Sequence, residues 1–131
     1  ELAPAICFEI TFPSEVAEQV RSGGTILVTV TNDAWYGDSW APWQHYRAAR
    51  FRAAENRRYL LRAAITGVSA IVGPRGEVEQ QLGVGEEGIL PGEIPGSVSL
   101  SPFTRYPWLM PAISFVIAAF AIFLARKGPK T

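Results

Sequence analysis

Cys7 is the residue of this sequence best suited to nucleophilic chemistry, and it is the only cysteine in the chain. It follows a short apolar stretch at residues 2–6 and precedes a sequence typical of a helix start. That order predicts a side chain displayed at the carboxyl edge of a sheet, where α/β proteins place their sites. A thiol needs activation to attack at neutral pH. The alternative is a structural role, because free cysteine is among the most buried residue types.

Two residues are candidate partners for the thiol. His45 is the only histidine, which allows a Cys–His pair, although a capping or packing role is equally compatible with its position. Glu9 lies two residues after Cys7, and on an extended segment such residues share a face, so Glu9 is predicted to orient a substrate or a neighbouring group. The lysines, Lys127 and Lys130, lie at the far end of the chain. A lysine needed for the chemistry would therefore come from residues upstream.

A second loop is predicted to line the same cleft. Residues 32–37 follow a β-branched stretch at 25–31, and the carboxyl ends of neighbouring parallel strands lie side by side. Asn32 and Asp33 have a simpler alternative role, which is to satisfy the backbone of the turn. The loop and its continuation carry a cluster of aromatic residues: Trp35, Tyr36, Trp40 and Trp43. Such a cluster is typical of a ligand pocket or of a loop that rests in a lipid interface.

The elements that must position these residues alternate in type. We expect strands over 2–6, 25–31, 59–64, 69–72 and 78–82, and helices from 13 to about 21 and from 44 to 58. Strands that alternate with helices at this spacing predict a layered α/β fold.

Local signals refine this prediction. Pro13 suits the first turn of a helix, with Thr11 or Ser14 as its cap. The strand at 25–31 is uncharged and largely apolar, so we expect it to be covered on both faces. A further short strand is expected at residues 89–90.

The arginines of the second helix do not indicate a nucleic-acid interface. The formal net charge is +0, so no basic footprint exists. Arg52 and Glu55 are three residues apart, as are Glu55 and Arg58, and this spacing predicts salt bridges along the helix. We therefore expect no nucleic-acid partner.

The C-terminal segment has the composition of a membrane helix. Residues 108–125 carry no charge, a length of roughly 27 Å as a helix. Tyr106 and Trp108 lie at one end, and basic residues begin at Arg126, which is the usual pattern at membrane interfaces. We expect residues 1–105 to form the α/β domain, 106–126 a transmembrane helix, and 127–131 a basic cytoplasmic tail. A buried or terminal hydrophobic helix of a soluble domain is the alternative.

Several segments together resemble one family. They are ICFEI (6–10), FP (12–13), TNDAWYG (31–37), QH (44–45), RAAENR (52–57), RA (62–63) and TGVSA (66–70). In this order they resemble the C-terminal half of the nitrilase-like domain of the apolipoprotein N-acyltransferase family, and the terminal segment resembles its last transmembrane helix. The resemblance covers nearly the whole chain. Soluble nitrilases share the strand–Cys–helix elbow but lack the terminal segment.

The resemblance implies the C-terminal half of an α-β-β-α sandwich that faces the periplasm from a bacterial inner membrane. It implies a Glu-Lys-Cys triad in which Cys7 matches the nucleophile. The matching Glu and Lys would lie upstream of Glu1, so we expect this chain to be a C-terminal fragment that is inactive alone. His45 then becomes a structural or loop residue instead of a base.

The implied reaction is acyl transfer by a monomer without metal or cofactor. Cys7 would take a fatty acyl chain from a membrane phospholipid as a thioester and pass it to the N-terminal diacylglyceryl-cysteine of an apolipoprotein. The backbone N–H of Phe8 is the expected oxyanion donor, and Glu9 and Trp35 are expected near the substrate. The competing hypotheses are a membrane-tethered nitrilase-type amidohydrolase for small amides or nitriles, and a non-catalytic membrane-anchored interaction domain.

Overall fold

Five strands form one mixed sheet in the computed structural model, which describes residues 1–126. They are β1 (Leu2–Ile6), β2 (Ile26–Asn32), β3 (Leu60–Ile65), β4 (Ser69–Val72) and β5 (Val78–Leu82). The order in space follows the order in the sequence; β1, β2 and β3 are parallel, whereas β4 and β5 are antiparallel to their neighbours. The predicted α/β fold is confirmed, and so are the predicted strands at 69–72 and 78–82.

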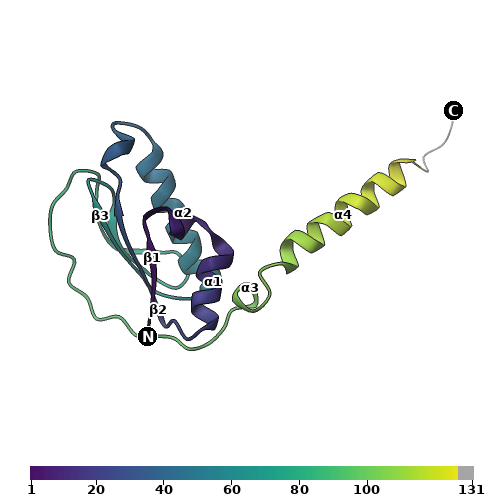
Figure 1. Ribbon diagram of the computed structural model, residues 1–131, viewed down its shortest axis with the longest axis horizontal. Coiled ribbons are helices and arrows are strands. Elements are labelled where there is room, and N and C mark those ends of the chain that lie inside the picture. The colour runs from purple at the N-terminus through teal and green to yellow at the C-terminus, as the bar shows by residue number, and fades with distance from the viewer. Residues whose placement is uncertain (127–131) are drawn as a thin grey trace.

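Helices connect the parallel strands and follow the last strand (Figure 1). Those before β3 are η1 (Cys7–Thr11), α1 (Pro13–Arg21), η2 (Ala34–Tyr36) and α2 (Ala41–Asn56), and those after β5 are α3 (Pro102–Arg105) and α4 (Leu109–Arg126). Helices α1 and α2 pack on one face of the sheet, where the core is built from small and branched side chains such as Ala3, Leu27, Ala53 and Leu60. Alanines on α2 allow its backbone to lie close to the strands.

Helix α1 begins as predicted but is capped differently. Pro13 occupies its first turn, where the missing N–H costs no hydrogen bond. The predicted caps Thr11 and Ser14 are wrong, because Phe12 is the capping residue and Ser14 lies inside the helix. Thr11 is already engaged in the preceding turn, where its hydroxyl donates to the carbonyl oxygen of Phe8 at 2.7 Å.

Of the two salt bridges predicted along α2, one is formed. The Arg52–Glu55 salt bridge is confirmed at 2.7 Å. The Glu55–Arg58 pair is wrong, because α2 ends at Asn56 and the left-handed residue Arg57 turns the chain away. Arg58 is instead buried and donates to the carbonyl oxygens of Gly24 and Ser99. It thereby ties the end of α2 to the return segment that follows β5.

One face of the sheet is uncovered in this chain. Leu2, Ile6, Val30 and Ile65 are each about half exposed or more, between 46% and 63%. The strand pairing aligns Ile6 with Val30, so these side chains share one face. The prediction that the strand at 25–31 is covered on both faces is therefore wrong for the described residues, since α1 and α2 both lie on the opposite side.

The chain after β5 returns along the sheet without regular structure. The short strand predicted at 89–90 is not formed, and hydrogen bonds to neighbouring segments hold this stretch instead. The side chain of Gln80 donates to the carbonyl oxygen of Pro91 at 2.8 Å. The amide of Ser97 donates to the carbonyl oxygen of Thr25 at 3.2 Å. Ser101 then caps α3 through a bond from the Thr104 amide.

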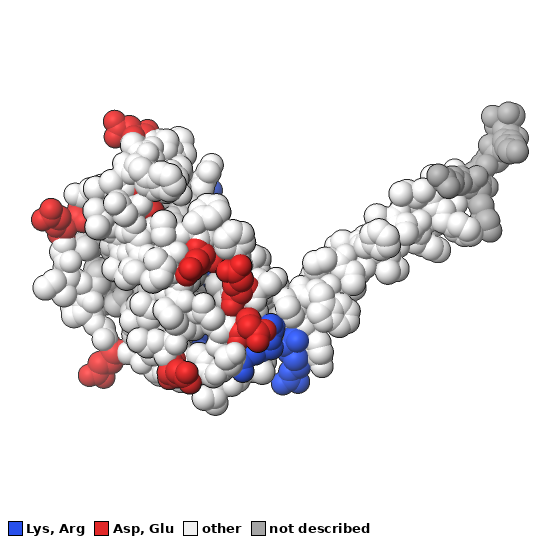
Figure 2. Space-filling view, viewed as in Figure 1, with Lys and Arg blue, Asp and Glu red and all other residues white. Residues whose placement is uncertain are grey.

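Helix α4 projects away from the α/β domain (Figure 1). In Figure 2 the coloured acidic and basic side chains lie on the domain and near the start of α4, whereas α4 itself is white up to its grey end. Within residues 1–126, no helix reaches both the length and the apolar character that a membrane crossing requires. The predicted basic tail at 127–131 lies outside the described residues.

Candidate active site

Cys7 stands at the carboxyl end of β1, as predicted, and it is the first residue of η1. It is partly exposed, so it is not the fully buried structural cysteine of the alternative hypothesis. Its backbone is left-handed, with φ of 52°, a conformation that costs a non-glycine residue about 1–3 kcal/mol. The surrounding hydrogen bonds must hold this turn, and such strained positions cluster at functional sites.

Glu9 stabilises the turn through a hydrogen bond to the main chain. Its carboxylate accepts a hydrogen bond from the Ile6 amide at 2.7 Å, immediately before the cysteine. The sequence argument that Cys7 and Glu9 share a face is wrong, because η1 is a tight helix of three residues per turn and not an extended segment. The observed contact of the Glu9 carboxylate is thus with the backbone.

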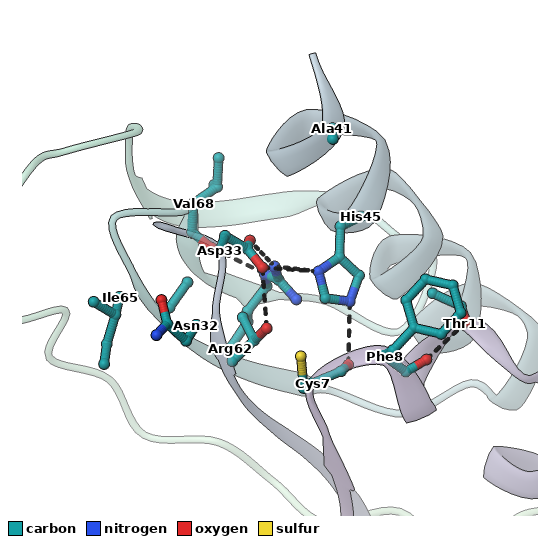
Figure 3. Close-up of polar contacts among 12 residues, drawn as sticks. Cys7, Phe8, Thr11, Asn32, Asp33, Ala41, His45, Arg62, Ile65 and Val68 are labelled. Atoms are coloured by element: carbon teal, nitrogen blue, oxygen red, sulfur yellow. Dashed lines mark hydrogen bonds and ion pairs between the residues drawn. The ribbon is translucent and has the colours of Figure 1, made fainter. Parts of the chain in front are cut away.

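A buried polar cluster lies beside the cysteine. Asp33, which follows β2, accepts hydrogen bonds from His45 on α2 and from Arg62 on β3, at 3.0 Å and 2.7 Å respectively. The side chains of Asp33 and Arg62 are completely buried, and that of His45 is nearly so. Figure 3 shows the cluster on the side of the backbone toward which the Cys7 thiol points. Residues from three separate elements therefore meet at this edge of the sheet, which confirms that the loop after β2 lies next to Cys7.

The electrostatics of the cluster are consistent with a charged Asp33. Burial alone would raise the pKa of Asp33, but the hydrogen bond from His45, the charge of Arg62 and the hydroxyl of Thr31 together hold it below its ordinary value. Burial lowers the pKa of Arg62, and the charge of Asp33 and its hydrogen bond to the guanidinium oppose that effect. The pairing of Asp33 with Arg62 satisfies the requirement that buried charges be paired.

Hydrogen bonds and a close glycine contact pack the segments around Asp33 tightly. Its amide donates to the carbonyl oxygen of Ile65 at 3.1 Å, and Arg62 Nε donates to that of Val68 at 3.0 Å. A Cβ atom at Gly67 would lie 2.8 Å from the Cβ and Cγ atoms of Asp33 and closer still to its carboxylate. Gly67 therefore allows the loop between β3 and β4 to pack directly against the Asp33 carboxylate.

His45 contacts the main chain of the cysteine and not its sulfur. Its Nε2 atom lies 3.1 Å from the carbonyl oxygen of Cys7, while Nδ1 faces Asp33 (Figure 3). Both ring nitrogens thus have partners, so the Cys–His pair in which the imidazole deprotonates the thiol is not what the structure shows. Asp33 likewise does more than satisfy a turn, a role that Asn32 performs by accepting from the Ala34 amide.

The aromatic loop flanks the cluster. Tyr36 stacks on Trp35 with 5.1 Å between ring centroids, and its own ring lies 6.2 Å from that of His45. The ring of Phe8 also lies 6.2 Å from that of His45, measured between centroids. Phe8, Tyr36 and His45 line one hollow of about 260 Å³ between η1 and α2. Trp35 is 74% exposed, and Trp43 packs against the core.

Arg62 is the residue of the cluster to which the sequence analysis gave no role of its own, although it belongs to the RA segment at 62–63. It interrupts the otherwise apolar strand β3. An arginine within such a strand must be paired when it is buried, so this pattern is the signal that could have found it. Among residues 1–126, no group of three His, Cys, Asp or Glu side chains could hold a metal ion.

Comparison with known proteins places this arrangement in a family. The sequence profile of the carbon-nitrogen hydrolases matches residues 1–101. Relatives named apolipoprotein N-acyltransferase include those of Haemophilus ducreyi and Rhodopseudomonas palustris. Each is 41% identical over 128 residues; the match covers 96% and 98% of this chain, and 25% and 24% of those proteins. The chain thus spans about a quarter of the length of these relatives.

Solved structures show the same fold. A mutant of the Nesterenkonia AN1 amidase from the nitrilase superfamily has a TM-score of 0.53 at 27% identity, over 63% of this chain and 34% of that one. A carbon-nitrogen hydrolase from Helicobacter pylori G27 has a TM-score of 0.56 at 19% identity, over 66% and 38%. The fold of the α/β domain is therefore shared with a solved amidase of the nitrilase superfamily and with a solved carbon-nitrogen hydrolase.

Proposed function

The chain belongs to the carbon-nitrogen hydrolase family, and on that premise we propose that it is the nucleophile-bearing part of an apolipoprotein N-acyltransferase. The observation that carries the proposal is the near-complete match to relatives of that name. The placement of the only cysteine at a strained strand end supports it. The resemblance found in the sequence points to the same family.

The proposed reaction has two half-reactions. The Cys7 thiolate attacks the carbonyl carbon of a phospholipid acyl ester; the C–O bond breaks, a thioester forms, and a lysophospholipid leaves with a proton. The α-amine of a diacylglyceryl-modified N-terminal cysteine then attacks the thioester. The C–S bond breaks, an amide forms, and the thiolate is regenerated as the amine gives up a proton. Division of the transfer at a thioester is ordinary covalent catalysis.

Each tetrahedral intermediate places negative charge on an oxygen that needs donors. We assign the Phe8 N–H to that role, because Phe8 is the second residue of η1 and amides at the start of a helix lack partners within it. Glu9 and Trp35 are proposed to lie near the substrate. The exposure of Trp35 leaves its ring free to contact a lipid chain.

The rest of the active site is proposed to come from outside this chain. A Glu and a Lys upstream would complete a Glu-Lys-Cys triad, with the Glu as base. The uncovered sheet face, with Ile6 and Val30 exposed on it, would pack against a second sheet to give an α-β-β-α sandwich. An exposed apolar sheet face of this kind favours burial against another layer.

We propose that residues 106–126 hold the domain at a bacterial inner membrane, as the last transmembrane helix does in the family that the sequence resembles, although the described part of α4 alone does not reach the length and apolar character of a crossing. The apolar side chains of α4, among them Phe115, Ile117 and Phe120, are more than half exposed, and Tyr106 and Trp108 pack edge to face at its start. Aromatic pairs at that position suit a membrane interface. The basic residues that follow support a cytoplasmic C-terminus and a periplasmic α/β domain.

The full-length protein that carries this chain tests the proposal. Incubated with labelled phospholipid and a diacylglyceryl lipopeptide, it should release lysophospholipid and acylate the amine of the peptide, and Cys7→Ala should do neither. Release of ammonia from small amides without consumption of phospholipid would instead indicate an amidohydrolase. The absence of both activities would favour an interaction domain.

A further inference from the structure

We propose that His45 is the positioning residue of the oxyanion site: it fixes the orientation of the Cys7–Phe8 peptide, and with it the direction of the Phe8 N–H. This inference deepens the proposed function and rests on it. The resemblance predicted only a structural or loop role for His45. The structure, however, places its ring on the one peptide group that joins the nucleophile to the expected oxyanion donor.

The argument begins with the geometry of that peptide group. A trans peptide is planar, so its C=O and N–H point in opposite directions. The Cys7 carbonyl points at His45 Nε2, 3.1 Å away (Figure 3). The Phe8 N–H must therefore point away from His45. Loss of the histidine contact would leave the orientation of this peptide to the backbone bonds of η1 alone, and any change in it would shift the donor as well.

The direction of the hydrogen bond is fixed by chemistry. A carbonyl oxygen only accepts, so Nε2 of His45 must carry the hydrogen. On the other side of the ring, Nδ1 lies 3.0 Å from an Asp33 carboxylate oxygen and 3.4 Å from the Arg62 guanidinium. Both groups hold Nδ1 in place, and the bond from Nε2 to the carbonyl oxygen also polarises the Phe8 N–H.

Asp33 and Arg62 hold the ring in this orientation. The carboxylate is shared between His45 and Arg62, and neither side chain can swing away because both are buried. The other groups that face the ring are the aromatic side chains of Phe8 and Tyr36, each 6.2 Å away between centroids. The imidazole is thus fixed on every side from which the described chain approaches it.

Several hydrogen bonds hold the left-handed turn at Cys7. The Glu9 carboxylate accepts from the Ile6 amide before the cysteine, and the Thr11 hydroxyl donates to the carbonyl oxygen of Phe8 after it. The side chain of His45 adds the contact to the carbonyl oxygen of Cys7 itself, which ties the peptide between the nucleophile and the expected donor to α2.

Two matched variants of the full-length protein test the inference. His45→Gln can place an amide N–H near the position of Nε2, whereas the shorter amide of His45→Asn reaches only the position of Nδ1. We expect His45→Asn to slow acyl-enzyme formation about 100-fold, in keeping with the loss of one oxyanion donor. Its KM for phospholipid should be unchanged, and His45→Gln should restore most of the rate. Equal losses in both variants, or a loss confined to KM, would overturn the inference.

A second measurement does not depend on catalysis. Protein labelled with [1-¹³C]cysteine and [¹⁵N]phenylalanine gives an NMR signal for each Cys–Phe peptide, and the signal of the Cys7–Phe8 peptide is the one lost in Cys7→Ala. That signal should move in His45→Asn and stay near its original position in His45→Gln. If it moves as expected while wild-type protein forms no acyl-enzyme, the proposed function fails but the positioning role stands. If it stays fixed in His45→Asn, the positioning role fails.

Discussion

Gly67→Ala should disable the site without touching any residue that meets the substrate. The new Cβ would lie 2.8 Å from the Cβ and Cγ atoms of Asp33, closer than real contacts allow. Overpacking of this kind costs about 1–3 kcal/mol. If Asp33 moves instead, the buried pair with Arg62 is broken, at about 3–5 kcal/mol. Movement of Asp33 also removes the carboxylate partner of His45, so acylation should fall together with stability.

The control is Gly83→Ala, where the new Cβ meets only the end of the exposed Glu86 side chain, 3.3 Å away. Thermal unfolding of the full-length protein should show a clearly lower midpoint for Gly67→Ala than for Gly83→Ala. Acyl-enzyme formation should fall by about 100-fold or more only in the former, in proportion to the loss of an oxyanion donor. Wild-type stability and rate in Gly67→Ala would refute the reasoning that the Asp33 cluster holds the site.

The remaining predictions concern charge, buried hydrogen bonds and backbone conformation. Asp33→Asn should cost about 3–5 kcal/mol at neutral pH. Because the folded-state pKa lies below the ordinary 3.8, the difference from wild type in pH-dependent denaturation should be constant above about pH 5 and shrink as the pH falls below 4; a difference independent of pH would contradict this. Asn56→Ala should cost about 1–3 kcal/mol in denaturant unfolding, because it leaves the buried Thr104 hydroxyl without its 2.9 Å acceptor; an unchanged midpoint would count against the contact. Arg57→Gly should stabilise by about 0.5–1 kcal/mol, since Arg57 is exposed and left-handed; destabilisation would show that its side chain matters more than its backbone.

The elements were largely predictable because their signals are local. Apolar runs and turn residues located β4 and β5 without error, and Pro13 located the start of α1. Predictions failed where a neighbouring segment changed the local outcome. In η1 the Thr11 hydroxyl donates to the carbonyl oxygen of Phe8, so it does not cap α1. The helical turn of η1 also places the side chains of Glu9 and Cys7 on different faces.

The site was predictable only in part, for a similar reason. Cys7 and the loop after β2 could be brought together from strand order alone, since parallel strands end at the same edge. The Asp33–Arg62 pair joins residues 29 positions apart, and although the apolar strand around Arg62 marks it as a buried arginine, its partner is set by the packing of the loop after β2. The contact between His45 and a main-chain carbonyl has no sequence signature, because it depends on how α2 packs over η1.

The central claim is that Cys7 carries the acyl group. Full-length protein exposed to phospholipid and then digested should yield, by mass spectrometry, a peptide containing Cys7 with one fatty acyl chain attached, and hydroxylamine should remove it as expected of a thioester. The same adduct should be absent from Cys7→Ala and should disappear from wild type when a diacylglyceryl lipopeptide is added. Acylation of another residue, or an adduct that persists in Cys7→Ala, would contradict the account.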